Sequence, residues 1–294
     1  MPVPTFRGAA RPTRLALAAL LAASAGCRDT DGPTAAASQA DARAQAAGTH
    51  LQYGVPVTVG NGRARTYVVL DQKTGAQLEL GVALDEQALE NLPVGGHGAH
   101  GPMTEYLLQL PAQDRSPFRF VELDWNPMGH GFPYEAPHFD FHFYTIPVEE
   151  RNTIDPSDPA FATKAANLPA ADLIPAGYLS SHQLVGKTPA EVSVPRMGLH
   201  WLDLASPELP PRNQPFTATY IVGTWNGKVI FQEPMITRAF ILGLRDGASA
   251  QAAYAVPSAA RYEPAGLYPS GYRVSWDAAR REFHVALTGL EPRS

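Results

Sequence analysis

Residues 137–144 read Pro-His-Phe-Asp-Phe-His-Phe-Tyr, and no other stretch of the chain constrains the fold so tightly. Successive side chains of a β-strand point to opposite faces. A strand here would turn three aromatic rings to one face: Phe139, Phe141 and Phe143. The opposite face would carry two imidazoles, a carboxylate and a phenol: His138, Asp140, His142 and Tyr144. The pattern predicts a strand with one face in a core and the other offering ligands for zinc, iron, manganese or copper.

The rest of the chain also favours strands. Short runs rich in aromatic or β-branched residues, bounded by Gly, Pro, Asn or Asp, predict them. These runs are residues 65–70, 77–84, 106–110, 118–125, 138–146, 216–225, 229–232, 236–242, 272–276 and 282–287. Asn226-Gly227 is typical of a type I′ hairpin turn, and residues 71–75 predict a second, longer hairpin loop.

Helices should be few and short. Asp85 can cap a helix over residues 86–92, and Asp158-Pro159 can begin one over residues 161–168. The chain has 28 prolines, each of which removes a backbone donor, so long helices are not expected. We therefore predict a mainly β protein, an antiparallel sandwich or barrel with a few short helices.

The N-terminus has the composition of an export signal, which plays no part in the fold. Three arginines precede an apolar stretch at residues 15–25, shorter than the about 20 residues that a membrane-spanning helix needs. Ser24-Ala25-Gly26-Cys27 resembles a bacterial lipobox, whose cysteine is acylated after cleavage, although Ser24 stands where leucine is usual. Ala23-Ser24-Ala25 also fits an ordinary small-x-small cleavage site, so two routes of export stay open.

The predicted organisation has three parts. Residues 1–26 form a signal peptide of the lipoprotein type, residues 27–50 a disordered tether, and residues 51–294 a single β-domain. The tether is rich in small and polar residues and cannot bury enough apolar surface to offset its ordering entropy. We expect an exported protein, either anchored in the cell envelope through a lipid on Cys27 or free in the periplasm.

Composition restricts the partners. Cys27 is the only cysteine, which excludes an internal disulfide and a zinc site made of several cysteines. The formal net charge of −5 becomes about −8 when residues 1–26, with three arginines and no acids, are removed. So acidic a chain argues against nucleic acid as a partner. A lipid on Cys27 is the expected link to the membrane.

The spacing of the octapeptide limits which residues can share a metal. Residues two apart on a strand lie about 6.6–6.8 Å apart, so both side chains can lean toward one ion. Asp140 can therefore share an ion with His138 or with His142. The two histidines stand about 13 Å apart on a straight strand, and a bulge would be needed to bring them together. The candidates from the rest of the chain, in order of preference, are His200, Glu233 and His130.

Each candidate also has an interpretation without a metal. The face with His138, Asp140 and His142 could be the solvated side of an amphipathic strand. His200, beside Trp201, could be a hydrogen-bonded core histidine, and Glu233 an ordinary charge at a strand end. Other chemistry has little support, because the chain lacks a Gly-x-Ser-x-Gly elbow, a His-Glu-x-x-His motif and a phosphate-binding glycine loop.

Five stretches carry a family resemblance. They are Glu105-Tyr106-Leu107-Leu108, residues 124–130 (Asp-Trp-Asn-Pro-Met-Gly-His), the octapeptide, residues 197–201 (Met-Gly-Leu-His-Trp) and residues 231–237 (Phe-Gln-Glu-Pro-Met-Ile-Thr). Together they resemble the bacterial TTHB-type domain family of unknown function, which takes its name from an exported protein of a thermophile under sigma-E control. The resemblance implies an exported, stress-regulated protein that forms homo-oligomers. It supplies no reaction and does not reach past Gly247.

Three functions stay open on the sequence alone. The first is an exported envelope protein with a His/Asp transition-metal site, zinc or iron foremost, and an unknown biochemical role. Three protein ligands would leave a coordination position open, so the protein could be a metal-dependent hydrolase or oxygenase, with Tyr144 or Glu233 exchanging protons. Alternatively it is a non-enzymatic module that sequesters metal or binds a partner, or a structural protein without metal.

Overall fold

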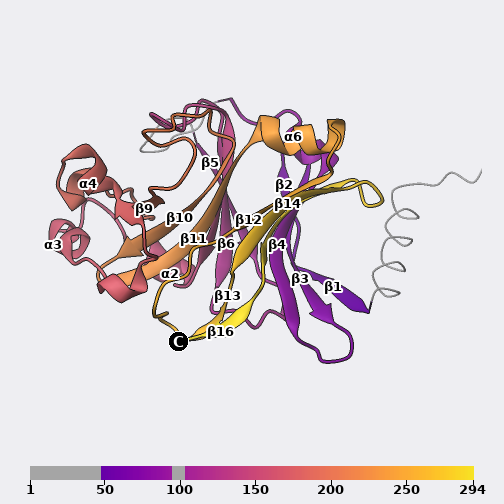
Figure 1. Cartoon of the computed structure of the whole chain (residues 1–294), viewed down its shortest axis with the longest axis horizontal. Helices are drawn as coiled ribbons and strands as arrows, with labels where there is room; N and C mark the ends of the chain where they lie inside the picture. Colours follow the sequence, from indigo (N-terminus) through magenta and orange to yellow (C-terminus); the bar gives the residue numbers. More distant parts are fainter. Residues whose placement is uncertain (1–47, 95–102) are drawn as a thin grey trace, which may run out of the picture.

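The computed structural model describes residues 48–94 and 103–294, so the predicted signal peptide, nearly all of the predicted tether and Cys27 lie outside the described residues. Two antiparallel sheets face each other (Figure 1). The first sheet has the order β1-β3-β4-β15-β14-β12, with β2 paired to β3. Its strands are β1 (Thr49–Tyr53), β2 (Val57–Val59), β3 (Gly62–Asp71), β4 (Gln77–Asp85), β12 (Gln251–Ala255), β14 (Gly271–Asp277) and β15 (Glu282–Thr288).

The second sheet has the order β5-β6-β7-β11-β10-β9-β8. Its strands are β5 (Thr104–Gln109), β6 (Phe120–Asn126), β7 (His138–Tyr144), β8 (Tyr178–Ser180), β9 (Leu199–Asp203), β10 (Ala218–Trp225) and β11 (Lys228–Thr237). A small ladder joins β13 (Gly266–Tyr268) to β16 (Glu291–Arg293). The predicted antiparallel sandwich is confirmed. Within the described ranges neither sheet closes on itself, so the alternative of a barrel is wrong.

Short helices decorate the sheets. The α-helices are α2 (Val148–Arg151), α3 (Phe161–Ala166), α4 (Ser181–Val185), α5 (Pro189–Val192) and α6 (Arg238–Asp246), and the 3₁₀ helices are η1 (Glu86–Leu89) and η2 (Ala171–Leu173). The predicted cap at Asp85 is confirmed, since its carboxylate accepts a hydrogen bond from the backbone N–H of Ala88 at 2.9 Å. In the part of the chain that is described, no helix is both long and apolar enough to cross a membrane.

Local sequence signals explain the hairpins. Asn226 and Gly227 have φ values of 47° and 80°, as a type I′ turn requires, and they join β10 to β11. In the second hairpin the Asp71 carboxylate accepts hydrogen bonds from the backbone N–H groups of Lys73 and Thr74, and β3 is joined to β4. Both predicted hairpins are confirmed.

One predicted strand is wrong. The run at residues 236–242 continues β11 only as far as Thr237, after which α6 begins at Arg238. Thr237 is the N-cap, and its hydroxyl accepts from the backbone N–H of Phe240 at 3.3 Å. Ile241 and Leu244, three residues apart, are the buried positions of the helix, so the run has helical rather than alternating periodicity.

The two faces of β7 have different surroundings. Phe139, Phe141 and Phe143 lie in the core between the two sheets, as predicted. The opposite face is covered by the long excursion of residues 147–198, which carries α2 to α5 beside β9, β10 and β11 (Figure 1). Every residue of β7 is therefore buried, and the interpretation of its His/Asp face as solvated is wrong.

Candidate metal centre

Strand pairing gathers polar side chains on the covered face of the second sheet. In the register of β6 and β7, Asn126 lies opposite His138, Asp124 opposite Asp140, and Glu122 opposite His142. Residues that are paired across antiparallel strands share a face and lie side by side. Three residues of β6 thus add an amide and two carboxylates to the ligands of β7, and all of them are buried.

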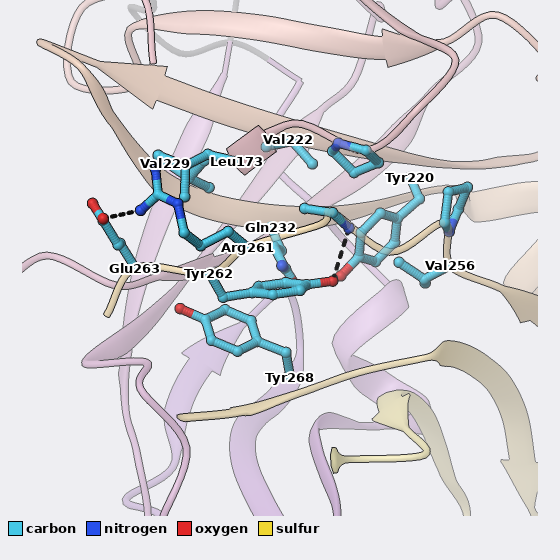
Figure 2. Close-up of a pocket in the computed structure, with 13 residues that line it drawn as sticks. Leu173, Tyr220, Val222, Val229, Gln232, Val256, Arg261, Tyr262, Glu263 and Tyr268 are labelled. Carbon is cyan, nitrogen blue, oxygen red and sulfur yellow. Dashed lines mark hydrogen bonds and ion pairs between the residues drawn. The ribbon is translucent and has the colours of Figure 1, made fainter. Parts of the chain in front are cut away.

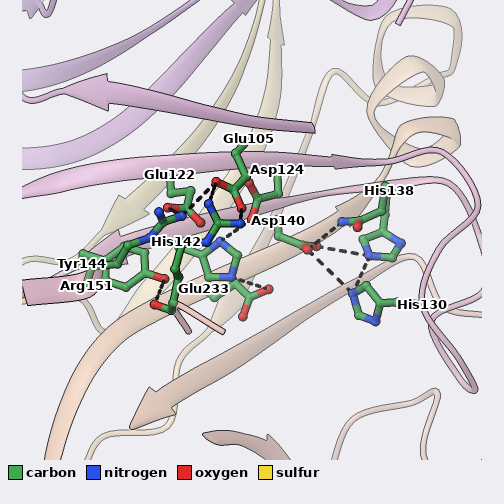
Figure 3. A network of polar contacts seen from close by, with 12 residues as sticks. Glu105, Glu122, Asp124, His130, His138, Asp140, His142, Tyr144, Arg151 and Glu233 are labelled. Carbon is green, nitrogen blue, oxygen red and sulfur yellow. Dashed lines mark hydrogen bonds and ion pairs between the residues drawn. The ribbon is translucent and has the colours of Figure 1, made fainter. Parts of the chain in front are cut away.

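His130, His138 and Asp140 form the first triad (Figure 3). The two Nε2 atoms of the histidines are 3.1 Å apart, and Asp140 oxygens lie 3.2 Å from His138 Nε2 and 3.7 Å from His130 Nε2. Ligands about 2.1 Å from a tetrahedral ion lie about 3.4 Å from one another. One ligand atom from each residue lies within 4.8 Å of the other two, so small shifts would bring the three atoms to the corners of a metal site.

Neighbouring groups hold the first triad in this geometry. His138 Nδ1 lies 2.6 Å from the carbonyl oxygen of Ala136, so Nδ1 carries the proton and the Nε2 lone pair faces the triad. Asn126 donates a hydrogen bond of 2.7 Å to one Asp140 oxygen. Burial alone would raise the pKa of Asp140, but His138 and His130 hold it well below its ordinary value. For His130 the directions are reversed: burial alone would lower its pKa, but the contact with Asp140 raises the pKa above its ordinary value.

His142, His200 and Glu233 form the second triad. Glu233 oxygens lie 3.5 Å from His142 Nε2 and 4.0 Å from His200 Nε2. The residues come from three strands: His142 from β7, Glu233 from β11 and His200 from β9, with β10 between the last two. Burial lowers the pKa of His142 to about 4 and raises that of Glu233 well above its ordinary value. His142 is therefore neutral at pH 7 and has a lone pair to offer.

Gly223 on β10 makes room for the second triad. It pairs with His200 on one side and with Phe231 on the other. A Cβ atom on Gly223 would lie 2.1 Å from the Phe231 ring, so only glycine lets that ring settle over the strand. The Phe231 ring in turn packs edge-on against His142, with centroids 4.7 Å apart, and 5.5 Å from the His200 ring. Phe231 thus fixes two of the three ligands.

A carboxylate network lies beside the second triad. Asp124 Oδ2 is 3.5 Å from His142 Nδ1, on the ring edge away from Glu233 (Figure 3). Glu122 forms an ion pair with the buried Arg151, which also contacts Glu105 at 3.2 Å. Burial raises the pKa of Glu122 to about 7 despite Arg151, and it raises that of Asp124 well above its ordinary value. Both oxygens of Asp124 and both ring nitrogens of His142 are buried, and none of these atoms has a hydrogen-bond partner among the described residues.

Both triads open onto one cavity with a volume of about 530 Å³. His130 and Asp140 of the first triad line it, together with all three residues of the second triad. A second, smaller cavity of about 20 Å³ lies between Tyr220, Tyr262 and Tyr268 (Figure 2). There the Tyr220 hydroxyl donates to Gln232 at 2.8 Å. The smaller space is that of a single water molecule, so it is not a ligand site.

The structure places all six predicted metal ligands on one covered face. It separates them into two groups, and the described residues do not bring His138 and His200 together in a single site. Glu233 is 1 % exposed within β11 and is not a strand-end charge. Tyr144 donates to the backbone carbonyl of Arg196 at 3.2 Å and does not line the cavity. Asn126, Asp124 and Glu122 were missed, because only the β6–β7 register reveals them.

Comparisons with known proteins add a family match but no function. Residues 73–125 match the TTHB210-like family, described as hypothetical protein TTHB210. This agrees with the resemblance to a TTHB-type domain of unknown function. The matched segment runs from the turn between β3 and β4 to Trp125, one residue before the end of β6. It therefore ends before the residues of the first triad. No curated protein and no solved structure matches the chain.

Proposed function

We propose that the protein is an exported transition-metal protein whose principal metal is held by His130, His138 and Asp140. The observation that carries the proposal is the convergence of one ligand atom from each residue to within 4.8 Å of the others, with the His138 tautomer fixed by Ala136. Two imidazoles and one carboxylate are the donor set of catalytic zinc sites and of non-haem iron sites. Zinc or iron is therefore the expected ion.

The arrangement favours a catalytic centre over a storage site. A metal with three protein ligands keeps a coordination position for water or substrate and lowers the pKa of a bound water. The cavity beside the first triad gives a substrate access to that position. Glu233 lines the same cavity, and burial raises its pKa well above the ordinary value, so without a metal at the second triad it would hold a proton that it can donate. Tyr144, which the sequence also suggests, is engaged elsewhere.

The second triad is a candidate for a second metal position. His142 Nε2 and one oxygen of Glu233 are buried without a hydrogen-bond partner, and a cation between them would satisfy both. Asp124 stands behind His142 Nδ1, as carboxylates commonly stand behind metal-binding histidines. The buried acidic residues favour the same conclusion. Of Glu122, Asp124, Asp140 and Glu233, only Glu122 forms an ion pair with an arginine among the described residues, and its partner is Arg151.

Metal content tests both positions. Residues 48–294 would be purified without chelator or affinity-tag metal, and bound zinc, iron, manganese and copper measured by mass spectrometry. We expect one equivalent to disappear in His138→Gln and a separate one in His200→Gln. His284→Gln is the matched control, because His284 is a buried histidine paired with Glu282 at 3.2 Å in the other sheet. Metal contents equal in His138→Gln and the unmodified protein would disprove the principal site.

The open coordination position can be tested with cobalt. Cobalt(II) bound at the first triad would give a visible spectrum, and azide added to it should change that spectrum by occupying the open position. We expect the azide response to be lost in His138→Gln and retained in His284→Gln. A spectrum that azide leaves unchanged would indicate a closed site and would favour the alternative of metal sequestration.

The proposed location rests on residues outside the described part of the chain. We propose that the protein is lipid-anchored in the cell envelope through Cys27, because this single cysteine follows the lipobox-like Ser24-Ala25-Gly26. The full-length chain should then partition into the membrane fraction, and Cys27→Ser should release it into the soluble fraction. Soluble full-length protein would favour cleavage after Ala23-Ser24-Ala25 and a free periplasmic form.

A further inference from the structure

The wall of the large cavity is mainly apolar, whereas its floor carries the ligands of both triads. The apolar side chains come from the sheet and from the segments that cover it. Those that define the wall are Phe132, Leu184, Val185, Leu202, Ile221 and Met235. Apolar walls with a few convergent polar groups are typical of small-molecule sites, and about 530 Å³ lies within their size range of about 300–1,000 Å³.

We propose that this cavity receives a small molecule with an uncharged, mainly apolar body and one nitrogen or oxygen donor that reaches the metal at the first triad. The inference rests on the proposed metal site and adds the class of its substrate. Its two parts, the absence of charge and the apolar body, follow from different observations.

The side chains around the cavity argue against an anionic group on the part of the substrate that lies away from the metal. Asp140 and Glu233 lie at the floor, with Asp124 behind them. Arg196 is the only arginine or lysine among the described lining residues, and its guanidinium already pairs with both carboxylate oxygens of Glu105. Away from the metal, a carboxylate or phosphate would therefore lose its hydration shell beside apolar side chains, without an unpaired arginine or lysine among the described lining residues.

The apolar part of the substrate follows from the cavity entrance. Three lining side chains are also exposed to solvent: Phe132 by 71 %, Val185 by 60 % and Leu184 by 40 %. Apolar surface thus runs continuously from the interior to the outside, where covering it by a ligand would be favourable. Most other large apolar side chains of the sandwich are buried, so exposure at this place is informative.

Ser181 gives the substrate a second polar contact. It lines the cavity from α4, and its buried hydroxyl oxygen has no hydrogen-bond partner among the described residues. A buried hydroxyl without a partner is costly, and a ligand that bonds to it would remove the cost. We therefore expect the substrate to carry a hydroxyl, carbonyl or amine within reach of Ser181 as well as the donor that reaches the metal.

Three probes with the same metal-binding ring test the proposal. Imidazole, 4-phenylimidazole and 4-(4-carboxyphenyl)imidazole would be titrated into the cobalt-loaded protein, and binding followed by the visible spectrum. We expect the phenyl group to tighten binding by about tenfold or more, because apolar burial is worth about 25 cal/mol per Å². The added carboxylate should abolish that gain.

Two variants locate the effect. Val185→Asp should remove the advantage of the phenyl group over imidazole itself. Val55→Asp is the control, because Val55 is also an exposed valine, 62 % accessible, and does not line the cavity. If the protein takes up metal but binds imidazole and 4-phenylimidazole with equal affinity, the inference about the substrate is wrong and the proposed metal site is retained. Failure to take up metal would overturn both.

Discussion

Single residues decide whether the second triad can form, and Gly223 is the clearest case. In Gly223→Ala the new Cβ would lie 2.1 Å from the Phe231 ring, so the ring must move away from its place against His142 and His200. We expect a loss of about 1–3 kcal/mol in the free energy of unfolding, the usual cost of overpacking a core. Metal should also be lost from the second triad and kept by the first.

A matched glycine serves as the control. Gly243 lies inside α6, and a Cβ atom there would meet nothing within 4 Å. Because alanine favours helix over glycine, Gly243→Ala should stabilise the protein by about 0.5–1 kcal/mol and leave both metals bound. Urea unfolding and metal analysis of both variants provide the measurement. A Gly223→Ala protein with full metal content would show that Phe231 does not position the second triad.

At this scale the sequence could nominate ligands but could not sort them. His138, Asp140 and His142 follow from strand alternation alone. Which of them joins His130, His200 or Glu233 depends on the order of β7, β11, β10 and β9, and strand order is a property of pairing between distant segments. The sequence also does not show that residues 147–198 cover this face of β7. For that reason it allows a solvated face, which the structure shows to be buried.

At the scale of elements, the end of β11 shows how a cap overrides β propensity. Residues 236–242 are rich in apolar and β-branched residues, which favours a strand, yet Thr237 caps α6. Thr237→Ala should cost about 1 kcal/mol in unfolding free energy, because it removes the hydrogen bond to the Phe240 N–H. Thr58→Ala, at an exposed position of β2, should change stability by less than about 0.5 kcal/mol. Equal effects in the two variants would refute the role of the cap.

The short helix α2 stabilises the region beside the site, because it places Arg151 against the carboxylates of Glu105 on β5 and Glu122 on β6. The Arg151 side chain is 3 % exposed and pairs with Glu122, which is fully buried. Arg151→Met would leave that carboxylate without compensation and should cost about 3–5 kcal/mol. Adding Glu122→Gln should restore most of the stability, since it removes the stranded charge.

The comparison for Arg151 is an exposed ion pair from the same helix. Lys228 lies 3.0 Å from Glu150, with side chains that are 60 % and 41 % exposed. Lys228→Met should change the unfolding free energy by at most about 1 kcal/mol, because solvent screens such pairs. Chemical denaturation of the four proteins tests the set, and a double variant no more stable than Arg151→Met alone would contradict the charge argument.

At the scale of the whole molecule, the sandwich places two different chemistries on the faces of one sheet. The aromatic face of β7 is used for the core that joins the first sheet to the second. The polar face is buried because the excursion of residues 147–198 covers it together with Tyr134, Leu209 and Phe216, and this burial perturbs the pKa values there. The cavity is the space that remains between that cover and the sheet. Residues 251–288 complete the first sheet, since β15 pairs with β4.

Burial of excess carboxylates predicts how the stability of the metal-free protein depends on pH. The pKa values of Asp124 and Glu233 are raised in the fold, so the native state holds protons that the unfolded chain releases above about pH 4. Their contribution to stability therefore falls as pH rises. His142 has the opposite sign: its pKa is about 4 in the fold, so its contribution falls only as pH drops from about 6.5 to 4. The raised pKa of His130 adds a contribution that is lost as pH rises through it.

Glu122, whose pKa is raised to about 7, adds to the same trend, so three carboxyls stand against one imidazole and leave a net loss of stability with rising pH. We expect the metal-free protein to lose about 2 kcal/mol or more per pH unit between pH 5 and 6.5, with His142 opposing the trend over that range. Denaturant midpoints measured with chelator at each pH would show it, and Asp124→Asn combined with Glu233→Gln should flatten the profile. Added zinc should do the same in the unmodified protein, because the cation favours the ionised carboxylates. If the metal-free protein instead became more stable from pH 5 to 7, these carboxyls would be ionised in the fold even without a cation, and the prediction would be wrong.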